Sequence, residues 1–374
     1  MGQSASWLVQ VTLGTAGNIT SGVGAGATYT AWGRSERRLS ESLARRLESN
    51  SAMKAIQVNQ TGGPEVMQLA DLPVPQPKPN EAVVKIAASG VNFIDVYLRE
   101  GRYKAPLPFV PGQEGAGSVT AVGAEVKSVK AGDRVAWCGV MGSYAEYAAV
   151  PAERLVPVPS GVNDQEAASV MLQGMTAQYL IYDTFPLKRG QTALIHAAAG
   201  GVGQLLVQMA HNIGARVIAT VSTDEKAELA KQAGADDVIL YSKVDFETET
   251  KRLTEGRGVD VVYDGVGKTT FAKSLNVLRL RGMMVLFGGS SGSVPPFDLL
   301  ELSQKGSLYV TRPRLFDYIV TTEELHARAN ALFKMIADGK LKLRIEHIYP
   351  LADAGTAHQE MEGRMTTGKL LLIP

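Results

Sequence analysis

The chain has a single cysteine, Cys138, among its 374 residues. A disulfide framework is therefore excluded, and this usage fits a reducing compartment. The sequence also lacks any uninterrupted apolar run of about 18 or more residues, so we expect no transmembrane helix. Charge is balanced as well, with a formal net charge of +1 and 20% charged residues. This composition is typical of a soluble protein and does not favour nucleic acid or a membrane surface as the main partner.

Residues that commonly bind metals are scarce. The chain has five histidines, and they are scattered without a His-x-x-His or similar spacing. One cysteine cannot build a four-cysteine zinc site, and a catalytic zinc site needs His, Cys or carboxylate ligands at fixed geometry. We therefore expect no metal. A half-buried strand position is the expected role of Cys138.

The most informative feature that is present is a glycine-rich turn. Residues 192–197 form an apolar, strand-like run, the chain then turns through alanines and glycines, and residues 204–211 continue with helical apolar spacing. In parallel α/β proteins such a turn seats a dinucleotide pyrophosphate, because the helix N-terminus offers free N–H groups and partial positive charge. The full pattern is G-x-G-x-x-G, and here its first glycine is an alanine. The expected pyrophosphate contacts are Ala198, Gly200, Gly201, Val202 and Gly203.

The end of the next predicted strand, at 216–221, indicates which dinucleotide is bound. NAD-binding proteins place Asp or Glu there to accept from the ribose 2′-OH, whereas this chain has Ser222. Ser222 and Thr223 can donate hydrogen bonds to a 2′-phosphate, and Lys226 adds a positive charge one helical turn later. Asp224 and Glu225 argue mildly the other way, although they also suit the first turn of a helix. We therefore favour NADP(H) over NAD(H); the alternative for Lys226 is a solvated helix face.

The pattern of elements changes along the chain. Residues 53–175 read as short strands and turns, with a half-buried strand at 81–87 and spaced prolines at 73–79 that cannot join a central strand. From about residue 176, strands alternate with helices, which predicts a doubly wound parallel sheet. Its expected strands are 192–197, 216–221, 237–241, 259–263, 283–287 and 307–311.

The last part of the chain is expected to return to the first domain. A helix is predicted at 322–338 and a final strand at 368–373. The predicted organisation is thus a β-rich domain at 53–175, completed by 313–374, and a nucleotide-binding domain at 176–312. Residues 1–52 offer no clear apolar face. We interpret them as an unstructured tail or a spurious extension upstream of Met53; the Arg- and Ser-rich composition leaves a transit peptide as the alternative, which three glutamates weaken.

Several short motifs beyond residue 52 carry a family resemblance. They lie at 90–97, 111–117, 196–203, 263–267, 287–292, 305–313 and 368–374. Together they resemble the medium-chain dehydrogenase/reductase superfamily, and within it the zinc-free quinone oxidoreductases of the zeta-crystallin-like branch. The resemblance implies an α/β protein in which a GroES-like β-rich catalytic domain is joined to a Rossmann doubly wound parallel sheet.

The resemblance also bears on metal and on chemistry. Zinc alcohol dehydrogenases of this superfamily carry a Gly-His-Glu motif, whereas residues 112–114 here read Gly-Gln-Glu, and glutamine is a poor zinc ligand. Without zinc there is no Lewis acid to polarise an alcohol or ketone. What remains is hydride donation from NADPH to an acceptor that is already electrophilic. The implied activity is NADPH-dependent quinone reduction.

The resemblance places Asn92, Tyr97 and Tyr103 at the nicotinamide and the acceptor. Asn92 can hydrogen-bond the cofactor or a quinone oxygen, and the two tyrosines can stack or donate a hydroxyl to a developing phenolate; a structural role for both tyrosines is the alternative. Asp95 is a weaker candidate for proton relay, or a local cap. We assign no general base.

The remaining expected cofactor contacts are spread over the nucleotide-binding half. Thr176 resembles a nicotinamide-proximal position, and Tyr241 is expected beside the 2′-phosphate. Four further residues are expected at the carboxyl ends of strands, where open α/β sheets bind ligands: Gly265, Phe287, Gly288 and Ser290. Arg312 is a candidate phosphate contact or else an ion-pair residue. His196 is expected to be a satisfied core histidine.

Two other functions stay open at this point. An enone or alkenal reductase would use the same fold and cofactor, with residues 92–110 setting the pocket shape. A non-enzymatic NADPH-binding protein is the third possibility, since some members of the family accumulate as lens crystallins or bind RNA. The absence of a basic cluster argues against nucleic acid. By resemblance we expect a homodimer paired through sheet edges, in the cytoplasm, or in the mitochondrial matrix if residues 1–52 are a transit peptide.

Overall fold

The computed structural model describes residues 52–374. The interpretations of residues 1–51 lie outside this range, and Ala52 already belongs to the first strand. None of the helices in the described range is long and apolar enough to cross a membrane.

The nucleotide-type half is a six-stranded parallel sheet in the order β10-β9-β8-β11-β12-β13. The strand order reverses between β8 and β11, and ligands of open α/β sheets bind outside the carboxyl ends of the strands at such a switch point. The strands are β8 (Thr192–Ile195), β9 (Arg216–Val221), β10 (Asp237–Leu240), β11 (Val259–Asp264), β12 (Leu278–Leu286) and β13 (Tyr309–Thr311).

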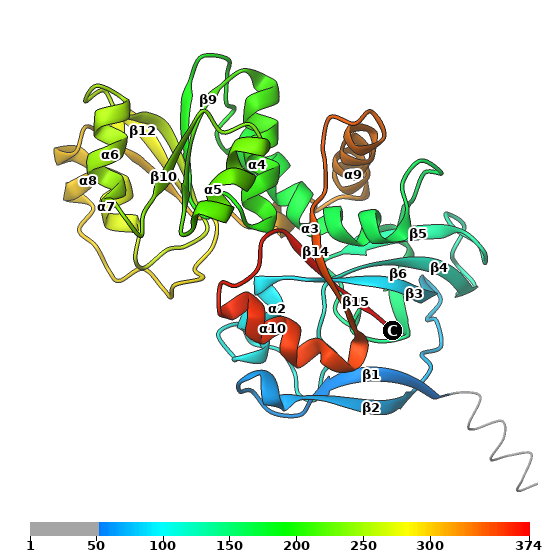
Figure 1. Cartoon of the computed structure of the whole chain (residues 1–374). Helices are drawn as coiled ribbons and strands as arrows, with labels where there is room; N and C mark the ends of the chain where they lie inside the picture. The colour runs from blue at the N-terminus through cyan, green and yellow to red at the C-terminus, as the bar shows by residue number, and fades with distance from the viewer. Residues whose placement is uncertain (1–51) are drawn as a thin grey trace, which may run out of the picture. The chain divides into compact units, whose positions relative to one another are not determined.

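Helices cover both faces of this sheet (Figure 1). Alternate strand residues enter different cores: Ala193 and Ile195 pack with α4 and α5, whereas Leu194 packs on the opposite face with α6 and α7. Both cores are apolar, so the central strands β8, β9 and β11 read as largely hydrophobic runs. The helices are α4 (Gly201–Ile213), α5 (Asp224–Gln232), α6 (Phe246–Leu253), α7 (Phe271–Asn276) and α8 (Leu300–Gln304).

The β-rich half contains a seven-stranded sheet in the order β14-β15-β3-β4-β5-β7, with β6 also paired to β3. The C-terminal strand β15 pairs antiparallel with β3, so the end of the chain completes this half as expected. The strands are β3 (Glu81–Val91), β4 (Glu114–Val122), β5 (Arg134–Cys138), β6 (Tyr147–Pro151), β7 (Val156–Pro157), β14 (Ile345–Pro350) and β15 (Lys369–Ile373).

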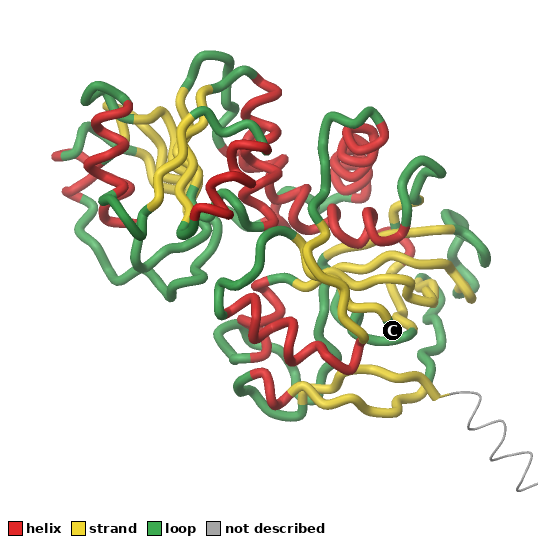
Figure 2. Tube along the Cα trace, in the orientation of Figure 1, coloured by secondary structure: helices red, strands yellow, loops and turns green. Residues whose placement is uncertain are grey.

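β1 (Ala52–Val58) and β2 (Met67–Pro73) form a separate two-stranded antiparallel sheet. Figure 2 distinguishes the strands, helices and loops of the chain by colour. The longer helices of this half are α2 (Phe93–Arg99), α3 (Asp164–Tyr179), α9 (Thr322–Ala337) and α10 (Ala354–Glu362). Short helical turns are η1 (Pro64–Val66), η2 (Ala152–Arg154), η4 (Leu315–Asp317) and η5 (Leu351–Asp353), and η3 (Leu180–Thr184) is a π-helical turn that continues α3.

Helix α3 links the two halves. It begins at a capping box formed by Asn163 and Glu166, and it packs on β3, β4 and β5 as well as on α4 and α9. Because it is covered on so many sides, most of its residues from Ala167 onward are buried. A buried helix of this kind holds its own side chains in fixed positions between the two halves.

The predicted strand positions of the parallel sheet are confirmed, with one notable shift. Strand β12 begins at Leu278, five residues before the predicted start at 283. Arg281 has φ +57°, and the pairing with β11 changes register nearby, so a bulge separates two short paired stretches. The charged residues at this bulge interrupted the apolar pattern on which the prediction rested.

Candidate functional site

A single large cavity brings together most of the residues predicted from the sequence. Its volume is about 930 Å³, and residues of both halves line it. The predicted residues in its wall are Asn92, Tyr97, Tyr103, Thr176, Gly200, Gly201, Val202, Gly203, Ser222, Lys226, Tyr241, Gly265, Phe287, Gly288, Ser290 and Arg312. A cavity of this size suits a dinucleotide together with a small acceptor.

Two of the predicted contacts are not part of the cavity wall. Ala198 is fully buried, and its N–H donates to the carbonyl of Thr220, which fixes it in the turn behind the cavity. The hydroxyl of Thr223 accepts from the N–H of Lys226 and caps helix α5. The Thr223 side chain thus serves as the cap of α5, and it is not part of the cavity wall.

The glycine-rich turn leads directly into α4. Gly200 is the N-cap of this 13-residue helix and has no side chain to satisfy the free N–H groups. A Cβ on Gly203 would lie 2.3 Å from the carbonyl oxygen of Ala197, so only glycine allows this close packing of helix on turn. The first turn of α4 therefore presents unpaired N–H groups to the cavity, which is the arrangement that binds phosphate.

His196 is a core histidine, as expected. Its two ring nitrogens contact the hydroxyls of Thr220 at 2.8 Å and Ser274 at 2.9 Å. Burial lowers its pKa, because the charged imidazolium would be desolvated. Both nitrogens are satisfied, so this histidine has no free group for catalysis.

Tyr97 and Tyr103 form the end of the cavity near α2. Their rings meet edge to face with centroids 5.4 Å apart, and the guanidinium of Arg102 lies over the Tyr97 ring. The Tyr97 hydroxyl accepts from the N–H of Gly289 at 3.2 Å, and burial raises the pKa of Tyr97. Tyr103 is 44% exposed. This end of the cavity therefore has one hydroxyl held by the backbone and one that is exposed to solvent.

The opposite end of the cavity is positively charged. The Lys226 ammonium donates to the carbonyl of Arg364 at 2.6 Å, and both residues line the cavity beside Ser222 and Tyr241. Desolvation lowers the pKa of Lys226, and the guanidinium of Arg364 adds to this effect. Two neighbouring cations suit an anionic ligand. Arg364 was missed from the sequence because it lies in the loop between α10 and β15, far from the nucleotide-binding motifs.

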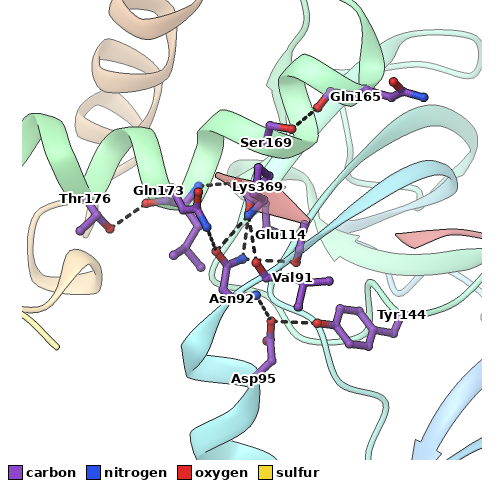
Figure 3. Close-up of polar contacts among 12 residues, drawn as sticks. Val91, Asn92, Asp95, Glu114, Tyr144, Gln165, Ser169, Gln173, Thr176 and Lys369 are labelled. Carbon is purple, nitrogen blue, oxygen red and sulfur yellow. Dashed lines mark hydrogen bonds and ion pairs between the residues drawn. The ribbon is translucent and has the colours of Figure 1, made fainter. Parts of the chain in front are cut away.

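A buried polar network surrounds Asn92, which lines the cavity (Figure 3). Asn92, Glu114 and Lys369 are each at most 3% exposed. The Asn92 amide donates to Glu114 at 2.8 Å, and its oxygen accepts from Lys369 at 3.0 Å and from Gln173 at 3.2 Å. The second N–H of Asn92 donates to the carbonyl of Gly90 at 3.2 Å. The hydrogen-bonding capacity of this amide is therefore used by the protein itself.

A second buried cluster surrounds Asp95, in the first turn of α2. Asp95 accepts from the N–H of Asn92 at 3.0 Å and from the Tyr144 hydroxyl at 3.2 Å, and Tyr144 also contacts His358 at 3.1 Å. Burial raises the pKa of Asp95 to about 7 and lowers that of His358 to about 3. Asp95 does not line the cavity. Its clear structural role is the capping box that begins α2.

The described range offers little to a metal ion. Between residues 52 and 374, no group of three or more His, Cys, Asp or Glu side chains is arranged to hold one. Gln113 is buried at the position that a zinc-ligating histidine would occupy in the related motif. Cys138 is fully buried rather than half-buried as expected, and burial raises its pKa well above the usual range.

Two family models match the chain. The "Alcohol dehydrogenase GroES-like domain" model matches residues 78–160, and the "Zinc-binding dehydrogenase" model matches residues 201–333. Together with an antiparallel-rich sheet completed by the C-terminus and a six-stranded parallel sheet, these matches define the medium-chain dehydrogenase/reductase architecture.

Curated relatives match nearly all of the described range. The chain is 47% identical to the quinone oxidoreductase of Pseudomonas aeruginosa and 45% identical to quinone oxidoreductase 1 of Escherichia coli. These alignments cover 86% and 85% of this chain and 99% of each relative. A 2-haloacrylate reductase of a Burkholderia species is 41% identical over 85% of this chain and 98% of its own length.

Solved structures agree with these relatives. The Escherichia coli quinone oxidoreductase complexed with NADPH has a TM-score of 0.84 and 44% identity, and a mycobacterial protein complexed with NADPH has 0.83 and 48%. Each match covers 86% of this chain and 100% of the other. The chain belongs to the quinone oxidoreductase family.

Proposed function

We propose that this protein is an NADPH-dependent quinone reductase that works without a metal. The observation that carries the proposal is one cavity with three regions that suit the parts of NADPH and its acceptor. These are the cations Lys226 and Arg364, the free N–H groups of α4, and the tyrosine pair at α2. Bound NADPH would supply the hydride, from C4 of its nicotinamide. The names of the similar proteins, quinone oxidoreductases and NADPH complexes among them, point the same way.

The protein's own groups have separable tasks in this proposal. Ser222, Lys226, Arg364 and Tyr241 hold the 2′-phosphate, and the first turn of α4 holds the pyrophosphate. Thr176, Gly265, Phe287, Gly288 and Ser290 shape the nicotinamide region, with Arg312 as a further cation in the wall. Such positioning accelerates the reaction because the donor and acceptor carbons are held together and water is excluded.

Tyr97 and Tyr103 are proposed to receive the quinone. Their rings offer aromatic surface for stacking, and a hydroxyl can donate to the oxygen on which negative charge develops. Asn92 is proposed to act mainly by fixing the loop before α2, because its amide is already fully hydrogen-bonded. Gln113 is a poor zinc ligand, and residues 52–374 contain no group of His, Cys, Asp or Glu side chains arranged for a metal; both support hydride transfer without a Lewis acid.

A second candidate is the reduction of activated enones. The 41% identity to a 2-haloacrylate reductase favours it, since that relative is named for an electrophilic alkene. The same cavity could position either acceptor, because hydride transfer needs only an electrophilic atom near the nicotinamide.

We also propose the domain division and the assembly. Residues 53–175 with 313–374 would form the catalytic domain, and residues 176–312 the NADP-binding domain. Strand β13 lies at the edge of its sheet, and Leu280, Leu299, Leu300 and Tyr309 nearby are 57–70% exposed. An open strand edge beside exposed apolar side chains favours pairing with a second copy, and hence a homodimer.

The direct test follows nicotinamide absorbance with purified protein, 1,4-benzoquinone or a bulkier ortho-quinone, and NADPH or NADH in parallel. Fast loss of NADPH with little loss of NADH is expected. Equal rates with both cofactors would contradict the 2′-phosphate assignment but keep the enzyme class. No turnover of any quinone, with turnover of a 2-haloacrylate, would favour the second candidate.

A further inference from the structure

The buried network of Asn92, Glu114 and Lys369 leaves one side chain with unused hydrogen-bonding groups. All three N–H groups of the Lys369 ammonium are used, toward the Val91 carbonyl, Asn92 and Glu114. Glu114 accepts from Asn92 and Lys369 with one oxygen and from the N–H of Leu172 with the other. Every polar atom of the three is satisfied, so the network is closed on itself.

Gln173 is hydrogen-bonded to this network, but the network uses only one of its hydrogen-bonding groups. Within residues 52–374 its amide nitrogen makes one side-chain hydrogen bond, to the oxygen of Asn92 at 3.2 Å, and Gln173 lines the cavity. One N–H and the whole carbonyl of Gln173 are therefore left for a ligand. Figure 3 shows this side chain directed from α3 toward Asn92.

The network also fixes which way the Gln173 amide points. The oxygen of Asn92 can only accept, and it already accepts from Lys369, so Gln173 must turn its nitrogen toward Asn92. Its oxygen then lies at the start of α4, where a Cβ on Gly201 would be only 2.0 Å away. Glycine at 201 thus leaves room for the Gln173 carbonyl between α3 and the phosphate-binding turn.

We infer that Gln173 is a binding residue for the nicotinamide half of the dinucleotide, and that Lys369 is the positioning residue that sets its amide through Asn92. The inference rests on the proposed function. Gln173 lies between the first turn of α4 and Asn92, so it would meet the part of the cofactor that follows the pyrophosphate. That part carries ribose hydroxyls and a carboxamide, which both donate and accept, as the free groups of Gln173 do.

The test compares two ligands on the full-length protein. Q173M keeps the length of the side chain but removes its polar groups, and Q165M is the matched control at an exposed site on the same helix. We expect Q173M to weaken NADPH binding about 5- to 10-fold, the loss of one or two hydrogen bonds, and to leave binding of 2′,5′-ADP unchanged. The fragment lacks the nicotinamide half, so a general distortion of the site would weaken both ligands.

The role of Lys369 is tested with charge-balanced variants, because removing one partner of a buried ion pair is strongly destabilising. E114Q/K369M and E114Q/K369Q are both neutral at this pair, and only the second keeps a hydrogen-bond donor at position 369. We expect E114Q/K369M to lose NADPH affinity as Q173M does, E114Q/K369Q to retain it, and Q173M added to E114Q/K369M to cause no further loss. Equal losses in both double variants, or additive losses, would overturn the positioning role.

The outcomes separate this inference from the proposed function. If the wild-type protein binds neither NADPH nor 2′,5′-ADP, both fall together. If it binds both and Q173M binds NADPH normally, or loses both ligands in proportion, the inference alone falls; this comparison does not depend on whether the double variants fold. The 3-acetylpyridine analogue of NADPH keeps the carbonyl oxygen of the carboxamide but lacks its N–H groups. A Q173M effect that vanishes with this analogue assigns the carboxamide N–H groups, and one that persists assigns the ribose hydroxyls or the carboxamide oxygen.

Discussion

The hydroxyl of Tyr97 accepts a hydrogen bond from the backbone N–H of Gly289, 3.2 Å away and 192 residues later in the chain. Tyr97 belongs to α2 in the β-rich half, whereas Gly289 follows β12 of the parallel sheet. This contact joins the Tyr97 side of the cavity to the carboxyl end of a sheet strand. In the proposed function it would tie a residue that receives the quinone to the segment that shapes the nicotinamide region.

We predict that Tyr97→Phe lowers quinone turnover about 10-fold or more and leaves the KM for NADPH within a factor of two. The hydroxyl is the only group removed, and a positioned proton donor contributes at least this much to the rate. Steady-state kinetics with benzoquinone and NADPH measure the effect. Tyr182→Phe is the control, since Tyr182 is exposed and lies outside the cavity. Unchanged turnover in Tyr97→Phe would show that this tyrosine is structural.

Lys226→Gln should reduce the preference for NADPH over NADH. Removing a cation that faces a 2′-phosphate costs a charge-assisted hydrogen bond, which corresponds to about 10- to 100-fold in the KM for NADPH. NADH lacks the phosphate, so its KM should hardly change. Lys231→Gln, on the exposed face at the other end of α5, is the matched control and should alter neither value. A parallel rise in both KM values would contradict a phosphate-specific role.

Gly90→Ala should destabilise the protein by about 3 kcal/mol or more. A Cβ at this position would lie 2.2 Å from a Glu114 oxygen and 2.7 Å from the Lys369 nitrogen, so the buried ion pair would have to separate. Gly161→Ala is the control, because its Cβ would have no neighbour nearer than 3.8 Å. Denaturant unfolding of both variants measures the difference. Similar stabilities would mean that the network tolerates displacement.

Asp95→Asn should change how stability depends on pH. The pKa of Asp95 is raised from 3.8 to about 7, so the folded state keeps a proton that the unfolded state has lost across that window. Wild-type stability therefore falls as pH rises from about 3.8 to about 7, and the loss is complete above that. The variant escapes this loss, so relative to wild type it should gain up to about 4 kcal/mol between the two limits.

His358 acts in the opposite direction over much of the same range. Its pKa is lowered from 6.5 to about 3, so the folded state loses stability as pH falls below 6.5. The two slopes oppose each other in the wild-type protein, and Asp95→Asn should expose the His358 contribution as a stability that rises with pH. Urea unfolding at several pH values from 4.5 to 8 measures both curves. Parallel curves for wild type and variant would contradict the assignment.

Local patterns in the sequence were sufficient to predict much of the fold. The parallel sheet was predictable because its central strands are buried on both faces and are followed by helix caps and turns, and the chain has such signals from Thr192 onward. The glycine turn was predictable for a similar reason, since Gly200 and Gly203 are required by local backbone packing. Strand β12 was misplaced at its start because its bulge has no apolar signature.

The site was only partly predictable. Most of the predicted residues share one cavity, but Thr223 caps α5 instead, since a threonine before a helix looks the same whether it binds phosphate or caps. Gln173, Arg364 and Lys369 were not identified. Their sequence surroundings are those of an ordinary helix, loop and strand.

What the sequence by itself determined is the class of fold, the position of the phosphate-binding turn and the residues around it, because these depend on contacts within a few tens of residues. Only the tertiary structure decided that Lys369 donates to the amide oxygen of Asn92, 277 residues away, and that Arg364 lies beside Lys226, 138 residues away. Such contacts depend on how the two halves of the described range pack against each other through α3. Packing of distant segments leaves no periodic trace in the chain, so it becomes visible only when the segments are placed in space.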